Sequence, residues 1–162
     1  MSVPKKQKRE WQPREMQMLS EWLAKFQSGK RYLTRVRLGS PKTEIPRPEM
    51  TPEERAMIGA WRRWADAIIL ENNKVTIIES ALRLDPGKIS QLELYAMLFP
   101  QTPEFRAWAG LPLELALLYA IPDSATIMMA REKGIKCIEY RPLWLDQYLE
   151  ILQPRERRGI RF

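Results

Sequence analysis

Residues 64–82 read WADAIILENNKVTIIESAL, and this stretch decides the fold. Two apolar runs, residues 64–70 and 75–82, flank the polar tetrapeptide Glu71-Asn72-Asn73-Lys74. Paired asparagines tolerate the positive backbone angles that hairpin turns require. The stretch therefore predicts two adjacent antiparallel strands.

Apolar periodicity predicts the elements on either side of this hairpin. Upstream we expect a helix that begins at Gln12-Pro13 and ends at Ser28-Gly29, a strand over 31–38, a proline-rich excursion over 41–52, and a short helix to about Ala60. Downstream we expect helices over 89–98, 124–133 and 143–152, with strands over 113–121 and 135–140. This order indicates an α/β fold, in the sense of an α+β mixed sheet covered by helices.

A chain of 162 residues suits a single domain. We expect that domain to span residues 13–153, between a basic N-terminal arm over 1–12 and a basic C-terminal arm over 154–162. A net charge of +7 favours polyanionic partners. No signal peptide or membrane-spanning run is evident, which indicates a cytoplasmic protein or a component assembled there.

Histidine is absent from the chain, which excludes Ser-His-Asp and Cys-His catalysis and the ordinary zinc sites. The single cysteine, Cys137, cannot form an internal disulfide and lies in an apolar alternation, so we expect a buried, inert thiol.

Asp66 and Glu79 each lie inside one of the two apolar runs of the hairpin. Because burying an unpaired carboxylate is expensive, two such groups on neighbouring strands could share Mg²⁺. The alternative is that each acid reaches a strand end or pairs with an arginine.

The order of Asp66, then Glu79-Ser80-Ala81, then the helical stretch 89–95 with Gln91 and Tyr95, resembles the PD-(D/E)XK nuclease superfamily, in particular its RecB-like and phage-borne members. The resemblance covers about residues 31–140. It implies an αβββαβ restriction-endonuclease-like core, here with an extra C-terminal helix and basic terminal arms.

In that family the aspartate and glutamate hold magnesium, which would assign the metal to Asp66 and Glu79. A lysine two positions beyond the glutamate helps to position or activate the attacking water, but Ala81 occupies that position here. Side chains 79 and 81 share a strand face, so the cation is missing from where the reaction would use it. Gln91 and Tyr95, four residues apart on one helix face, resemble the polar motif that supports the family's active site.

Two residues are candidates to replace the missing lysine: Lys88, on the turn into the helix, and Arg83, on the strand face of Glu79. We expect Lys88 to be a solvated surface charge. Further nucleic-acid candidates lie on one side of the strand over 31–38, namely Arg31, Arg35 and Arg37. Trp22, Trp61, Trp64 and Trp144 fall in apolar stretches that predict core or interface anchors, which leaves Trp108 as the exposed candidate for base stacking.

These features favour a catalytically degenerate PD-(D/E)XK-like protein that requires no cofactor and serves as a structural or nucleic-acid-binding component of a larger assembly. The resemblance extends this to a phage particle, located in the host cytoplasm or the virion. The expected partners are other subunits bound through the terminal arms, in an oligomer or hetero-assembly, and DNA, but no membrane. The alternatives are an active Mg²⁺-dependent DNA nuclease that uses Lys88 or Arg83, and an adaptor that contacts neither metal nor DNA.

Overall fold

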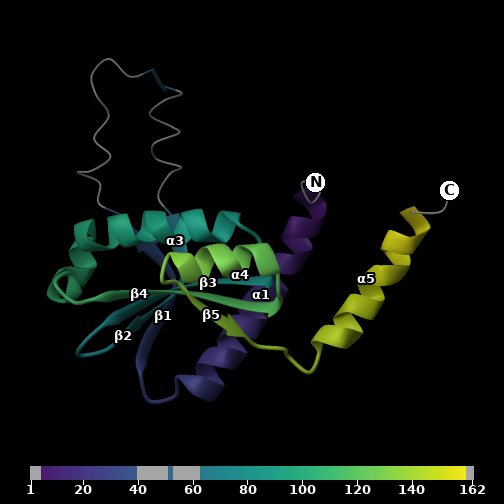
Figure 1. The fold of residues 1–162 in the computed structure, drawn as a ribbon, viewed down its shortest axis with the longest axis horizontal. Coiled ribbons are helices and arrows are strands. Elements are labelled where there is room, and N and C mark those ends of the chain that lie inside the picture. Colours follow the sequence, from purple (N-terminus) through teal and green to yellow (C-terminus); the bar gives the residue numbers. More distant parts are fainter. Residues whose placement is uncertain (1–4, 40–50, 53–62, 160–162) are drawn as a thin grey trace.

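A computed structural model describes residues 5–39, 51–52 and 63–159 (Figure 1). In these ranges the helices are α1 (Lys5–Phe26), α3 (Gly87–Leu98), α4 (Ser124–Glu132) and α5 (Leu145–Gly159), with 3-10 turns η1 (Phe99–Gln101) and η2 (Pro103–Trp108). The strands are β1 (Arg31–Leu38), β2 (Arg63–Leu70), β3 (Val75–Arg83), β4 (Leu113–Ile121) and β5 (Lys136–Glu139). The predicted α/β fold class and the predicted order of these elements are confirmed.

The five strands form one mixed sheet in the order β1-β2-β3-β4-β5. The predicted hairpin is confirmed, since β2 and β3 pair antiparallel and the Glu71 N–H donates to the Lys74 carbonyl at 3.0 Å. β4 then pairs parallel to β3, β5 pairs parallel to β4, and the crossover between β3 and β4 contains α3.

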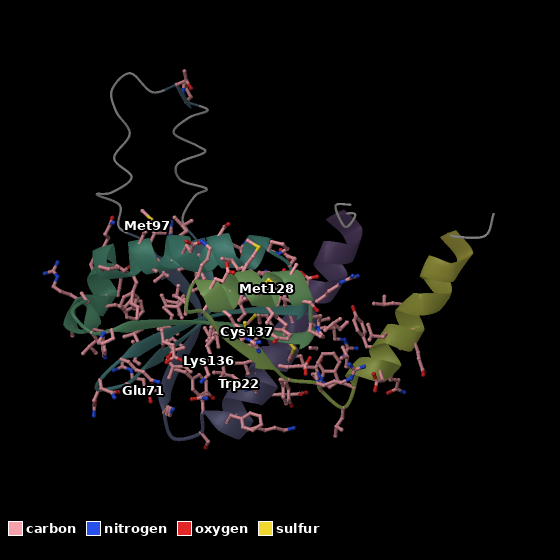
Figure 2. The ribbon with its side chains drawn as sticks, in the orientation of Figure 1. Trp22, Glu71, Met97, Met128, Lys136 and Cys137 are labelled. Carbon is pink, nitrogen blue, oxygen red and sulfur yellow. The ribbon has the colours of Figure 1, made fainter. Side chains whose placement is uncertain are left out.

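Helices cover both faces of the sheet (Figure 1). On one face, Ile89, Leu92 and Tyr95 of α3 pack with Ala130 of α4 over the sheet. On the other face, α1 packs through a stripe of apolar residues, and the start of α5 joins it: Met18, Leu19, Trp22, Leu23 and Leu145. Met97 and Met128 lie on the solvent side of α3 and α4 (Figure 2).

Two helix boundaries were predicted wrongly. α1 begins at Lys5, so Pro13 lies inside the helix rather than at its start. α5 continues to Gly159 instead of ending near residue 152. The residues before Pro13 in α1 and after Pro154 in α5 are mostly Lys, Arg, Gln and Glu. These residue types favour helix, so they extend both helices without any apolar stripe. The predicted borders between the arms and the domain therefore fall within helices. The predicted short helix to Ala60 and most of the predicted excursion over 41–52 lie outside the described residues.

None of the helices in the described part of the chain combines the length and the apolar character needed to cross a membrane.

Candidate active site

The backbone pairing of the sheet is interrupted on both sides of Asp66. The β2–β3 register ends at Ala67 opposite Ile78, and the β1–β2 register passes from Thr34 opposite Ala67 to Val36 opposite Ala65 without pairing residue 66. Where the backbone pairing stops, side chains accept the hydrogen bonds instead. Asp66 Oδ2 accepts from the Ser80 N–H at 2.8 Å and from the Ser80 hydroxyl at 2.9 Å. In return, Glu79 Oε1 accepts from the Asp66 N–H at 3.3 Å. The two acids predicted from the sequence are therefore brought together across the hairpin.

Glu79 is almost completely buried, with 3% of its surface exposed. Burial raises the pKa of Glu79 to about 8, and the negative charge of Asp66 adds to the rise. Lys88 acts in the opposite direction, since its ammonium lies 3.6 Å from Glu79 Oε2. Without more positive charge than Lys88 supplies, Glu79 holds its proton at neutral pH.

Lys88 is not the solvated surface charge that we expected. It is the second residue of α3, and only 21% of its side chain is exposed. Burial by itself lowers the pKa of an amine, but Glu79, Glu15 and Asp66 outweigh that effect, so the pKa of Lys88 is raised. The turn explains the placement: Asp85 accepts from the Gly87 N–H at 2.8 Å, and α3 then returns over the sheet with its first turn beside the end of β3.

The sequence interpretation did not include Glu15 of α1, which lies at the same site. Glu15 Oε1 accepts from the Leu82 N–H at 3.4 Å, and burial raises the pKa of its carboxyl. The signal was its spacing: Glu15 precedes the buried residues Met18 and Leu19 by three and four positions, which places it on the buried stripe of α1.

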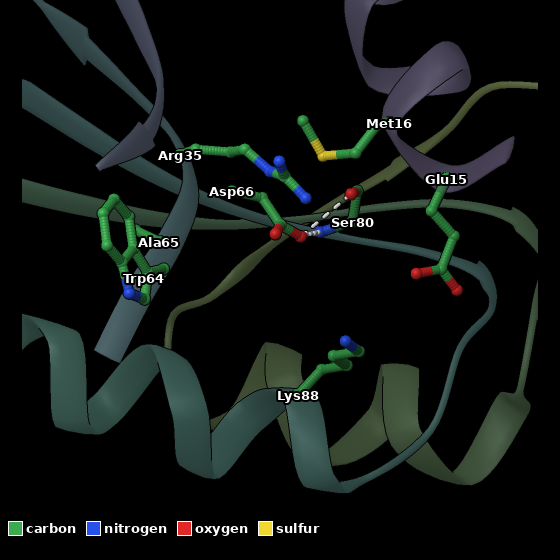
Figure 3. A pocket seen from close by; sticks show the side chains of 8 residues that line it. All are labelled: Glu15, Met16, Arg35, Trp64, Ala65, Asp66, Ser80 and Lys88. Carbon is green, nitrogen blue, oxygen red and sulfur yellow. Dashed lines mark hydrogen bonds between the residues drawn. The ribbon is translucent and has the colours of Figure 1, made fainter. Parts of the chain in front are cut away.

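A pocket of about 380 Å³ opens between α1, α3 and the strands β1 to β3 (Figure 3). Its lining residues are Glu15, Met16, Arg35, Trp64, Ala65, Asp66, Ser80 and Lys88. Figure 3 shows Lys88 rising from α3 toward Asp66 and Ser80, with Glu15 approaching from α1.

Arg35 enters the pocket from a strained backbone. Its φ of 52° is the only positive φ outside glycine in the described residues, and it occurs in β1 between Thr34 and Val36, whose partners Ala67 and Ala65 flank Asp66. A side chain in this left-handed region costs roughly 1 to 2 kcal/mol, so the surrounding pairing must hold it there. The strain coincides with the pocket, because Arg35 lines it and points toward Asp66 (Figure 3).

The remaining basic candidates lie elsewhere. Arg83 is exposed at the end of β3, and its charge helps to lower the pKa of Asp123, which is lowered chiefly by hydrogen bonds from Thr126. Arg31 stacks over the Trp108 ring at 5.2 Å, and Arg37 is exposed outside the pocket lining. Of the two suggested replacements for the missing lysine, the structure brings only Lys88 to the acids.

The two residues of the polar helix motif have different surroundings. The Tyr95 hydroxyl donates to the Trp64 carbonyl at 3.1 Å and so fixes β2 two residues before Asp66. Gln91 lies one turn after Lys88, and its buried Oε1 has no hydrogen-bond partner within the described residues. Tyr95 therefore supports the site through the backbone of β2.

Three further residues differ in burial from what the sequence predicts. Of the two alternatives for Trp64, core or interface anchor, the core is wrong, because 57% of its surface is exposed at the edge of the pocket. Trp108, which we expected to be exposed, is half-buried against Phe105, at a ring-centroid distance of 6.3 Å. Cys137 is half-buried rather than buried, and burial raises the pKa of its thiol, in keeping with an inert group.

The oxygen donors of this site fit Mg²⁺. Mg²⁺ in phosphate-processing sites is held by one or two carboxylates, completed by water and substrate phosphate. Asp66 and Glu79 are linked across the hairpin, and among the described residues no group of three or more candidate metal-ligating side chains occurs. Oδ1 of Asp66 accepts no hydrogen bond from the described part of the chain, and a cation would also offset the cost of ionising buried Glu79.

No family model matches the sequence, and no curated protein is significantly similar to it.

Proposed function

We propose that this protein is a Mg²⁺-dependent DNA nuclease of the PD-(D/E)XK type, in which Lys88 of α3 replaces the lysine that is missing at Ala81. The observation that supports this most is the position of the Lys88 ammonium, 3.6 Å from Glu79 and inside the pocket that Asp66 lines. The first turn of a helix thus supplies the cation that the family's strand normally provides.

The side chains suit hydrolysis of a phosphodiester. Attack of water on phosphorus forms one P–O bond, breaks the bond to the leaving nucleotide oxygen, and builds negative charge on the non-bridging oxygens. The attacking water gives up a proton to solvent, and the leaving oxygen takes one up from solvent. Lys88 stays protonated at neutral pH because its pKa is raised, so it serves as a fixed positive charge for those oxygens rather than as a base. Asp66 and Glu79 would hold Mg²⁺, which when bound supplies Lewis-acid polarisation of the phosphate.

A second candidate function is favoured by one observation, the buried Ala81 at the family's lysine position. In that case the protein is a catalytically inactive member of the same superfamily that serves as a structural or nucleic-acid-binding component of a phage particle. Its terminal segments would then contact other subunits.

Cleavage by the purified full-length chain distinguishes the two functions. We expect it to cut labelled DNA with Mg²⁺ and to stop when the metal is chelated. Asp66→Asn, which keeps the shape and an acceptor for Ser80, should reduce the rate by about a hundredfold or more, because it removes a metal-binding charge.

Asp123→Asn is the matched control, since Asp123 caps α4 outside the pocket and asparagine caps equally well. It should cut at the wild-type rate. If the wild-type chain fails to cut single- and double-stranded DNA with either Mg²⁺ or Mn²⁺, the second candidate function replaces the first.

A further inference from the structure

The edge of the pocket carries an aromatic side chain beside a cation. Trp64 of β2 exposes 57% of its surface while lining the same cavity as Asp66. Its backbone is fixed, because the Tyr95 hydroxyl donates to its carbonyl at 3.1 Å, and the neighbouring Ala65 is fully buried. The indole is thus held at the cavity by an anchored strand, where it adds little to the core.

Arg35 provides a free positive charge next to this indole. Among the described residues no ion pair or hydrogen bond involves its guanidinium, whereas Lys88 is paired with Glu79. A left-handed backbone carries Arg35 into the pocket that Asp66 lines. A guanidinium can bind two phosphate oxygens at once, and an indole face can stack on any nucleobase.

The two groups lie within reach of a single nucleotide. Trp64 and Asp66 are two residues apart on β2, which corresponds to about 7 Å along a strand. Arg35 lies on β1 between the partners of Ala67 and Ala65, and Figure 3 shows its guanidinium pointing toward Asp66, with the indole of Trp64 to one side. A nucleotide whose phosphate meets Arg35 can therefore place its base against Trp64.

We propose that Trp64 and Arg35 bind an unpaired nucleotide, with the base stacked on the indole and the phosphate on the guanidinium, so that the substrate is single-stranded DNA. A base within a duplex is stacked on both faces, and it must leave the stack before it can lie on an indole. This inference rests on the proposed nuclease function. The contacts that it assigns to Trp64 and Arg35 affect binding of the nucleotide, and binding can be measured without cleavage.

The test measures binding of a fluorescent oligothymidylate, and of a blunt duplex of equal length, by anisotropy. The full-length chain carries Asp66→Asn and Mg²⁺ is omitted, so that cleavage plays no part. Trp64→Ala should weaken single-strand binding roughly ten- to a hundredfold, the range for loss of one base–aromatic stack. Trp64→Phe should recover most of that loss.

Two further variants separate stacking from folding. Phe26→Ala is the matched control, because Phe26 is 60% exposed at the end of α1, outside the pocket lining, and its loss should leave binding unchanged. Arg35→Gly removes the guanidinium but suits the positive φ, so it should weaken binding and reduce its salt dependence while the thermal midpoint is kept.

The outcomes distinguish this inference from the proposed function. If Trp64→Ala binds the oligothymidylate as tightly as its parent, or if the duplex binds as tightly as the single strand, the inference is overturned even when metal-dependent cleavage is found. If the Trp64 and Arg35 effects appear while the wild-type chain cuts nothing, the inference holds and the nuclease function fails.

Discussion

Replacing Lys88 with methionine should reduce DNA cleavage about a hundredfold or more, because it removes the fixed positive charge that, under the proposed function, meets the developing charge on the phosphate. The fold should survive. Methionine keeps the unbranched side chain out to the ε position, and Glu79, with its pKa already near 8, can stay protonated and uncharged when its partner is lost. Initial rates on labelled DNA, with thermal unfolding alongside, provide the measurement.

Lys133→Met is the matched control, because Lys133 forms an exposed ion pair with Glu93 outside the pocket lining. It should leave the rate unchanged. A second site provides a gain of function: Ala81→Lys, added to Lys88→Met, returns a cation to the strand face of Glu79 and should restore part of the lost rate. Wild-type cleavage by Lys88→Met would show that Lys88 is not the replacement lysine.

The stability of the metal-free protein should fall as the pH rises from about 5 to about 8. In this window the unfolded chain ionises Glu79, whereas the folded chain holds its proton, since the pKa of the carboxyl is raised to about 8. The folded state therefore binds more protons, and stability decreases with rising pH until the folded group also ionises. The raised pKa of Glu15 acts in the same direction.

The expected loss is on the order of 2 to 4 kcal/mol across the window. Urea unfolding in the presence of a chelator, repeated at several pH values, measures it. Glu79→Gln cannot ionise but keeps an acceptor for the Asp66 N–H, so its stability should change much less over the same range. Equal slopes for the wild type and Glu79→Gln would contradict a raised pKa at Glu79.

The sequence was sufficient for the hairpin and for its two acids, because both depend on local pattern. Alternation and the Asn72-Asn73 turn predict adjacent strands, and a carboxylate inside an apolar run is visible at once. The position of Lys88 depends instead on the direction in which α3 leaves the turn after Asp85, and local pattern does not fix that direction. Lys88 was for this reason expected in solvent, although it lies 3.6 Å from Glu79.

The remaining members of the site depend on tertiary packing. Glu15 reaches the pocket only because α1 crosses the end of β3, as its contact with the Leu82 N–H shows. Arg35 has the alternation of an ordinary strand residue, and nothing local predicts its positive φ. Trp64 stands in an apolar run that favours burial, but the strand presents its indole to the pocket edge rather than to the core.

Around Asp66, hydrogen bonds to side chains replace the backbone hydrogen bonds of the sheet. This replacement gives the site its own spectroscopic reporter. The amide hydrogens of Ser80 and Asp66 are held by carboxylate oxygens and not by the carbonyls of a strand. Their exchange with deuterated solvent therefore depends on what those carboxylates bind, while amides deeper in the same sheet depend on unfolding. A cation that draws Asp66 or Glu79 away from these amides would change their protection without opening the sheet, so occupancy of the site can be followed in a chain that is not turning over.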